Sequence, residues 1–195
     1  MLEITLHILD VAENGITAGA DLIFIKVDEA RRDNFLEITI ADNGRGMDAK
    51  TLKKVTDPFF TSRVTRTVGL GLSLLKEAAK KCQGEFSITS TPGKGTRVWA
   101  SFVFDHIDRA PVGDMVGTIM VLLGGNPAVD FVYEHIVDGE KFELDTRKIK
   151  TTLGDTSLTD PAVIHHLSQT IAEHLNGLTQ KRSDAQTNGD QIWQS

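Results

Sequence analysis

The chain has 195 residues, of which 40% are hydrophobic, and a formal net charge of −6. No apolar run reaches the roughly 18 residues that a membrane-spanning helix needs, and no block of basic residues favours nucleic acid. Cys82 is the only cysteine, which excludes an intrachain disulfide, and the first residues lack the pattern of a signal peptide. We therefore expect a folded, cytoplasmic protein that spans no membrane and binds no nucleic acid.

Residues 3–18 are predicted to form a helix, because apolar and polar residues each recur at three- and four-residue steps. The apolar or small stripe consists of Ile4, Ile8, Val11, Gly15 and Ala18. The polar stripe consists of Glu3, His7, Asp10, Asn14 and Thr17. A polar stripe is usually a solvated face, but the depth of Asn14 in this helix also allows a role in a site.

Short strands and helices follow up to residue 104. The expected strands are 22–27, 35–41, 85–90 and 96–104. The expected helices are a short one that Asp48 caps and that ends at Val55, and an amphipathic one over residues 69–82 that Gly84 ends. The turn at residues 91–95 joins the last two strands as a hairpin with a glycine-rich tip.

The character of the sequence changes after residue 105. The expected elements are a linker at 105–114, helices at 116–123, 146–153 and 161–175, and strands at 131–137 and 141–144. Asp138-Gly139 predicts a two-residue hairpin between these strands. We expect a first domain over residues 1–105, a C-terminal α/β extension over 106–178 packed on it, and a polar, disordered tail over 179–195.

Asp42 is the strongest chemical signal, because it ends a strand and begins the sequence Asp42-Asn43-Gly44-Arg45-Gly46-Met47. Glycines let the backbone approach a flat ligand closely. A carboxylate can accept a hydrogen bond from an exocyclic amine such as adenine N6. An ordinary Asp-Asn-Gly turn after a strand explains the same residues equally well.

Gly69-Leu70-Gly71-Leu72 opens the amphipathic helix. The free N–H groups and the positive end of the helix dipole at such a position favour a phosphate. Taken alone, the two glycines indicate only the entry into a helix. The motif gains weight from its place among the others.

The motifs occur in a fixed order: the Asn14 helix, Asp42 to Met47, Asp57-Pro58-Phe59-Phe60-Thr61-Ser62, Gly69 to Leu72, and Gly93-Lys94-Gly95-Thr96. Over residues 3–104 this order resembles the GHKL ATPases, the family of sensor histidine kinases, DNA gyrase and the mismatch-repair ATPases. The resemblance implies a two-layer α/β sandwich, with a mixed, mainly antiparallel sheet and helices on one face. It also implies ATP and Mg²⁺ as cofactors.

The resemblance assigns site residues as well. Asn14 matches the family's magnesium ligand, Asp42 the residue that reads adenine, and Thr96 the threonine that supports the adenine site. Residues 69–72 match the phosphate motif, and residues 57–61 resemble the F box of histidine kinases. The implied nucleotide-binding residues are Asn14, Ala18, Asp42, Gly44, Gly46, Met47, Phe60, Arg63, Gly69, Leu70, Gly71, Leu72 and Thr96.

Asp10 is the candidate general base, because a carboxylate four residues before Asn14 shares its helix face. Hydrolysing members of the family have a glutamate here, and the shorter aspartate can instead contact metal-bound water or Asn14. His7 is expected to be an ordinary polar-face histidine, with a hydrogen bond to Asp10 as the alternative. Arg63 and Arg66 can supply positive charge to the triphosphate, or they lie in a solvated loop.

Three functions fit this sequence, and a kinase-like enzyme is the preferred one. Such a module would transfer the γ-phosphoryl group of ATP to a partner protein, and the early position of Asn14 leads us to expect the acceptor on another protein. A slow ATPase or ATP-gated switch is the second function, favoured by Asp10. The third is a non-catalytic ATP-binding module whose residues 106–175 dock a partner. Those residues either carry a partner surface or only cover hydrophobic surface.

Overall fold

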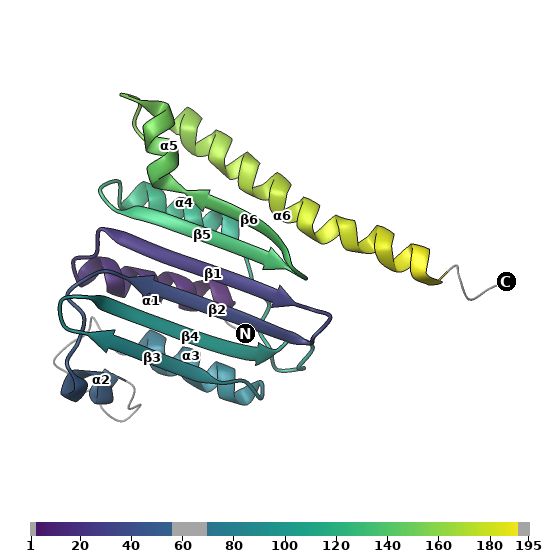
Figure 1. The fold of residues 1–195 in the computed structure, drawn as a ribbon, viewed down its shortest axis with the longest axis horizontal. Coiled ribbons are helices and arrows are strands. Elements are labelled where there is room, and N and C mark those ends of the chain that lie inside the picture. The colour runs from purple at the N-terminus through teal and green to yellow at the C-terminus, as the bar shows by residue number, and fades with distance from the viewer. Residues whose placement is uncertain (1–2, 56–69, 191–195) are drawn as a thin grey trace.

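The protein forms two layers in a computed structural model that describes residues 3–55 and 70–190 (Figure 1). One layer is a six-stranded sheet in the order β3-β4-β2-β1-β5-β6. The strands are β1 (Leu22–Ala30), β2 (Phe35–Asp42), β3 (Phe86–Thr91), β4 (Gly95–Val103), β5 (Asp130–Val137) and β6 (Glu140–Asp145). The helices are α1 (Ile4–Thr17), α2 (Ala49–Val55), α3 (Leu70–Lys81), α4 (Met115–Gly125), α5 (Thr146–Leu153) and α6 (Pro161–Asp190).

The sheet is mixed and mainly antiparallel. β1 runs antiparallel to β2 and parallel to β5, and the other three neighbouring pairs are antiparallel. Helices α1, α3 and α4 lie behind the sheet in Figure 1, and α6 packs on α4, β5 and β6. The predicted fold class, an α/β sandwich with a mixed sheet, is therefore confirmed.

The core lies between the sheet and the helices. In β1, Ile23, Ile25 and Val27 are fully buried, whereas the residues between them are half-buried. This period of two turns one face of the sheet toward the helices. The apolar stripe predicted for the first helix meets that face, because Ile4 and Ile8 are 1% and 0% exposed.

Local signals at helix ends mostly act as the sequence predicts. Asp48 caps α2, since the Thr51 N–H donates to Asp48 Oδ1 at 2.6 Å. The end of α3 differs from expectation, because the left-handed residue is Gln83, with φ of 56°, rather than Gly84. A Cβ added at Gly84 would lie only 1.8 Å from the Ser101 carbonyl oxygen. Gly84 is therefore required for close packing on β4 rather than for the helix end.

The segment after residue 105 continues the main sheet. The hairpin of β5 and β6 turns at Asp138 and Gly139, with φ of 48° and 92°, as predicted, and β5 lies beside β1. Helix α6 runs to Asp190, although we expected it to end near Leu175 and the tail after residue 178 to be disordered. Residues 179–190 contain no proline that would end the helix, although most of them, Gly189 included, are weak helix formers. None of the helices in the described ranges, α6 included, combines the length and apolar character needed to cross a bilayer.

A buried polar chain links β1 to β5. Glu29, His135 and Tyr133 are 6%, 5% and 0% exposed. One tautomer of His135 satisfies both neighbours: the Tyr133 hydroxyl donates to Nδ1 at 2.6 Å, and the Nε2–H donates to Glu29 Oε1 at 2.9 Å. The Arg31 Nε–H donates to the other Glu29 oxygen at 2.8 Å. Every member of this chain therefore has a partner, as buried polar groups require.

Candidate functional site

Asp42 lies at the end of β2, opposite Thr96 of β4 in the sheet register. The Gly44 N–H donates to Asp42 Oδ1 at 2.9 Å, and the Thr96 N–H is a second donor to the carboxylate. Burial raises the pKa of Asp42, and these two backbone hydrogen bonds offset part of the rise. An ionised carboxylate has more acceptor positions than two donors fill, so Asp42 can accept a further N–H from a ligand.

The C-terminal half of α1 packs directly on the loop that follows Asp42. A Cβ added at Gly15 would lie 2.8 Å from the Asp42 Cβ, which is too close for two carbon atoms. At Gly44, an added Cβ would lie 3.0 Å from the Ala18 carbonyl oxygen. The Arg45 N–H donates to that same oxygen at 3.0 Å. Small residues on both sides therefore let the helix and the loop meet at backbone distance.

The glycine-rich tip between β3 and β4 packs on the other side of the Asp42 loop. Gly46 has φ of 63°, and a Cβ there would lie 2.1 Å from the Thr91 carbonyl oxygen. Gly95 has φ of 100°, and a Cβ there would lie 1.9 Å from the Asp42 carbonyl oxygen. Both positions therefore need glycine for backbone packing, whether or not a ligand also approaches them.

Asn43 explains why an ordinary turn was an equally good interpretation of the Asp42 sequence. Its Oδ1 accepts the N–H groups of Asp21 and Leu22, each at 3.0 Å, and its Nδ2 donates to the Asp21 carboxylate. These bonds tie the loop to the start of β1. The turn is therefore compatible with a binding role, because Asn43 holds the loop and the Asp42 carboxylate takes no part in these bonds.

Ser90 is a site-forming residue that sequence reasoning missed. It lies on β3 opposite Thr96 of β4, and its Oγ is 2.9 Å from Thr96 Oγ1. The Met47 N–H donates to Ser90 Oγ at 2.8 Å, and the Gly95 carbonyl oxygen lies 3.0 Å from it. The signal was available in principle, because a hairpin turning at residues 91–95 places residues 90 and 96 side by side.

The start of α3 lies against the middle of α1. A Cβ added at Gly71 would lie 2.9 Å from the Asp10 Cβ and 3.0 Å from its Oδ2. Asp10, Asn14 and Ala18 share one face of α1, because they are four residues apart. Asp10 contacts the start of α3 and Ala18 contacts the Asp42 loop. Asn14, halfway between them and half-buried, therefore faces the space between these two elements.

The remaining predicted residues of the phosphate end divide into two groups. Leu70 begins α3, and Leu72 is 5% exposed and packs in the core, so Leu72 has a structural role whatever else it contacts. Phe60, Arg63 and Gly69 lie outside the described residues, as do residues 57–62 and Arg66. Their roles stay predictions.

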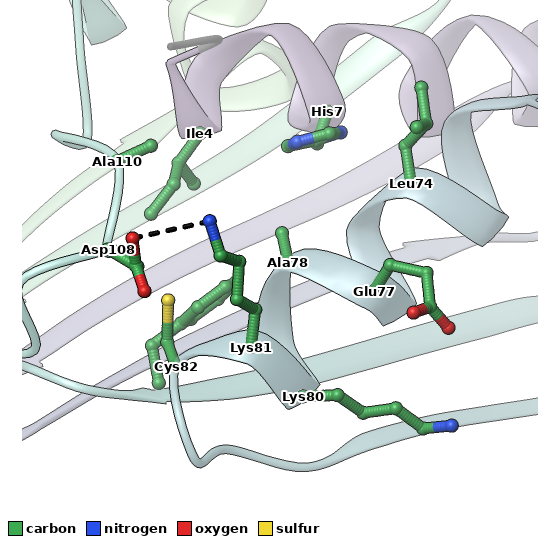
Figure 2. Close-up of a pocket in the computed structure, with 11 residues that line it drawn as sticks. Ile4, His7, Leu74, Glu77, Ala78, Lys80, Lys81, Cys82, Asp108 and Ala110 are labelled. Atoms are coloured by element: carbon green, nitrogen blue, oxygen red, sulfur yellow. Dashed lines mark ion pairs between the residues drawn. The ribbon is translucent and has the colours of Figure 1, made fainter.

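His7 is buried, which differs from the ordinary polar-face histidine that we expected. It is 6% exposed, and burial lowers the pKa of its imidazole, while the nearby charge of Asp10 acts in the opposite direction. His7 lines a groove of about 720 Å³ between α1 and α3. Figure 2 shows this groove and the nearby ion pair of Lys81 and Asp108, whose charged atoms are 3.2 Å apart. Cys82 lines the same groove and is 2% exposed, so its thiol belongs to the core.

The described residues contain no ready-made cluster of charged metal ligands. Within the described residues, no three His, Cys, Asp or Glu side chains are grouped so that they could hold a metal ion. A magnesium ion beside Asn14 would therefore take most of its ligands from nucleotide phosphates and water, which is how proteins commonly bind this ion.

Known sensor kinases are similar to part of this chain. The sensor protein kinase FleS of Pseudomonas aeruginosa is 38% identical over 105 residues, which are 54% of this chain and 25% of that protein. The histidine-protein kinase AtoS of Escherichia coli K12 is 43% identical over 63 residues, which are 32% of this chain and 10% of that protein. The chain thus spans a quarter or less of the length of these kinases.

A solved structure and a family model complete the comparison. The MutL ATPase domain of Aquifex aeolicus complexed with ADP aligns with a TM-score of 0.45 at 14% identity, over 75% of this chain and 66% of that one. Residues 2–106 match the family model of histidine kinase-, DNA gyrase B- and HSP90-like ATPases. Because this match covers more than half of the chain and includes every described residue of the site, the chain belongs to the histidine kinase-, DNA gyrase B- and HSP90-like ATPase family.

Proposed function

We propose that this protein binds Mg-ATP among α1, the Asp42 loop and the start of α3, and transfers the γ-phosphoryl group to a partner protein. The observation that carries the proposal is the convergence of these three elements. Ala18 meets Gly44 at one end of the α1 face, and Asp10 meets Gly71 at the other end. The kinase relatives support transfer as the purpose of the bound nucleotide.

The adenine end of the proposed site is the Asp42 loop. Asp42 accepts the N6 amine, which is a donor in adenine, whereas guanine has the O6 acceptor at the corresponding position. Gly44 and Gly46 let the loop pack closely on Ala18 and Thr91, which holds the loop in place beside Asp42. Thr96 lies next to Asp42 in the register. Ala18 and Met47 border the same loop and complete the set of base contacts that we propose.

The phosphate end of the proposed site is the start of α3 together with Asn14. Gly71 and Leu70 belong to the first turn of α3, where free N–H groups attract phosphate oxygens. The amide oxygen of Asn14 is a hard ligand that suits Mg²⁺. Magnesium, when bound there, would neutralise phosphate charge, while Asn14 and the helix start hold the nucleotide in place.

Hydrolysis is a second candidate function, and Asp10 favours it. The carboxylate is exposed and lies against the helix start at which the phosphates would bind. A carboxylate in this place can orient and deprotonate a water molecule. We therefore propose slow ATP hydrolysis as the alternative to phosphotransfer, with Asp10 as the candidate general base.

Replacement of Asp42 by Ala is expected to weaken ATP binding by about ten- to a hundredfold, because a buried polar pair is worth about 1–3 kcal/mol. Titration calorimetry with ATP and GTP measures this, and wild-type protein should prefer ATP. Asp155→Ala removes an exposed carboxylate in the turn after α5 and is the matched control. Unchanged ATP affinity in Asp42→Ala, or equal ATP and GTP affinity in the wild type, would refute the adenine assignment.

Incubation with γ-labelled ATP is expected to place label on a partner protein in a magnesium-dependent reaction. EDTA and the Asn14→Ala variant should both abolish labelling, because each removes the metal from the phosphates. Glu13→Ala changes the neighbouring exposed residue of α1 and should leave labelling intact. Release of phosphate without a labelled protein, lost in Asp10→Asn, would instead select the ATPase. ATP binding with neither product would leave only a binding module.

A further inference from the structure

Ser90 joins the two walls of the proposed base site through one hydroxyl group. Its Oγ accepts the Met47 N–H at 2.8 Å, which fixes the end of the Asp42 loop. The same Oγ lies 2.9 Å from Thr96 Oγ1 on the neighbouring strand. Thr96 in turn is in register with Asp42 and donates its N–H to the Asp42 carboxylate. Ser90 thus contacts both groups that flank the aspartate.

The Ser90 hydroxyl has a single proton, so it can donate only one hydrogen bond at a time. Both the Gly95 carbonyl oxygen at 3.0 Å and Thr96 Oγ1 at 2.9 Å lie within its reach. The carbonyl oxygen can only accept, whereas a threonine hydroxyl can do either. When Ser90 donates to Gly95, Thr96 must donate to Ser90, and the remaining acceptor positions of Thr96 are turned outward. When Ser90 donates to Thr96, the Thr96 proton is free for another acceptor.

We propose that Ser90 is a specificity-determining residue of the nucleotide site, which acts by setting the direction of the Thr96 hydroxyl next to Asp42. The inference rests on the proposed function, since it concerns how that site distinguishes bases. In this proposal Asp42 accepts a hydrogen bond from a donor on the base. The oriented Thr96 hydroxyl makes a hydrogen bond with the neighbouring polar atom on the edge of the base. A hydroxyl that rotates freely can satisfy a donor or an acceptor, and it therefore discriminates less between adenine and guanine.

A purely structural role for Ser90 makes a different prediction. The hydrogen bond to Met47 holds the loop in place. If that were the whole role of Ser90, loss of the bond would lower the affinity for every nucleotide by the same factor. The ratio of ATP to GTP affinity separates the two roles, because only the orientation of Thr96 changes that ratio. Ser87 provides the matched control, because it lies on the same strand and its side chain is exposed.

The test measures ATP and GTP affinities of the full chain by titration calorimetry in wild type, Ser90→Ala, Ser90→Thr and Ser87→Ala. Loss of one neutral hydrogen bond should lower the ATP-to-GTP preference about three- to tenfold in Ser90→Ala. Ser90→Thr keeps the hydroxyl and should restore the preference, and Ser87→Ala should not change it. If Ser90→Ala lowered the affinities for ATP and GTP by the same factor, the inference would be overturned.

Two further outcomes separate this inference from the proposed function. If Asp42→Ala abolishes the preference for ATP over GTP and Ser90→Ala leaves this preference unchanged, the adenine site stands and only the proposed role of Ser90 is wrong. If wild type shows no ATP preference, the adenine site itself is wrong and the Ser90 inference fails with it. If Ser90→Ala does not fold, Ser90→Cys, which keeps a weak donor, should show a reduced preference. A full preference in that variant would overturn the inference.

Discussion

Removal of residues 106–195 is expected to unfold the remaining chain, although all proposed nucleotide contacts precede residue 97. Strand β5 pairs with β1 along its whole length, so β1 would become an open edge. The truncation also removes four side chains that are at most 1% exposed: Phe131 and Tyr133 of β5, and Ile119 and Leu122 of α4. The side chains that pack against them would then face water. Each large buried side chain is worth about 1.5–3 kcal/mol, whereas a whole domain has a net stability of only about 5–15 kcal/mol.

The same segment also holds the first turn of α1. The N–H groups of Ile4 and Thr5 donate to the carbonyl oxygens of Pro111 and Val112 at 3.0 and 2.9 Å. No side chain caps this helix end, because Glu3 at the N-cap makes no such bond. Truncation therefore leaves two N–H groups of the helix that carries Asp10 and Asn14 without their acceptors.

Circular dichroism and thermal unfolding of residues 1–105 measure the effect. Aggregation or loss of the cooperative transition is the expected result. A second truncation after residue 178 removes only the end of α6 and should unfold like the full chain. A folded 1–105 fragment that binds ATP would contradict the prediction. If that fragment also lost its partner in a pull-down, the extension would instead be the partner surface.

Replacement of His135 by Leu is expected to lower the free energy of unfolding by about 3–5 kcal/mol, because it breaks a buried hydrogen-bonded pair. The variant removes the donor to Glu29 and the acceptor for the Tyr133 hydroxyl together. Urea unfolding at pH 7 measures the loss. Glu134→Gln on the same strand loses only a surface ion pair with Lys141 and should cost less than about 1 kcal/mol. Equal stability of His135→Leu and wild type would show that the buried hydrogen bonds of His135 contribute nothing to the free energy of unfolding.

The pH dependence of stability follows from Glu29 and gives an independent check. Burial pushes the pKa of Glu29 up, but the hydrogen bonds from His135 and Arg31 and the charge of Arg31 outweigh it, so the pKa lies below its ordinary value of 4.5. The unfolded chain therefore binds a proton at a higher pH than the folded protein does. The stabilisation is complete above pH 4.5 and is lost as the pH falls through the folded pKa. Glu29→Gln should remove this part of the acid sensitivity, and an unchanged acid profile would contradict it.

Much of the fold and of the site could be predicted because the signals are local. The spacing of Ile4, Ile8 and Val11 determines which face of α1 is buried, and the carboxylate of Asp48 determines where α2 begins. Asp138-Gly139 specifies the β5–β6 turn through its two positive φ angles. Each of these signals acts within a few residues, so the chain does not need its tertiary structure to express them.

The positions of His7 and Glu29, and the contact of Ser90 with Met47, could not be predicted in this way. His7 has the period of a polar stripe, yet it is buried beside a groove that α3 helps to line, and periodicity does not say which neighbour lies on a helix face. The predicted hairpin places Ser90 opposite Thr96, but only the tertiary structure brings the Met47 N–H to the same hydroxyl.

The sequence by itself determined the elements, the order of the nucleotide motifs and the chemistry that they favour, because periodicity, caps and turn residues act over short distances. Only the tertiary structure decided that β5 lies beside β1 and that Glu29 meets His135, which are 106 residues apart. Contacts over such a separation depend on which buried faces fit together, and that is a property of the whole packed chain rather than of any segment.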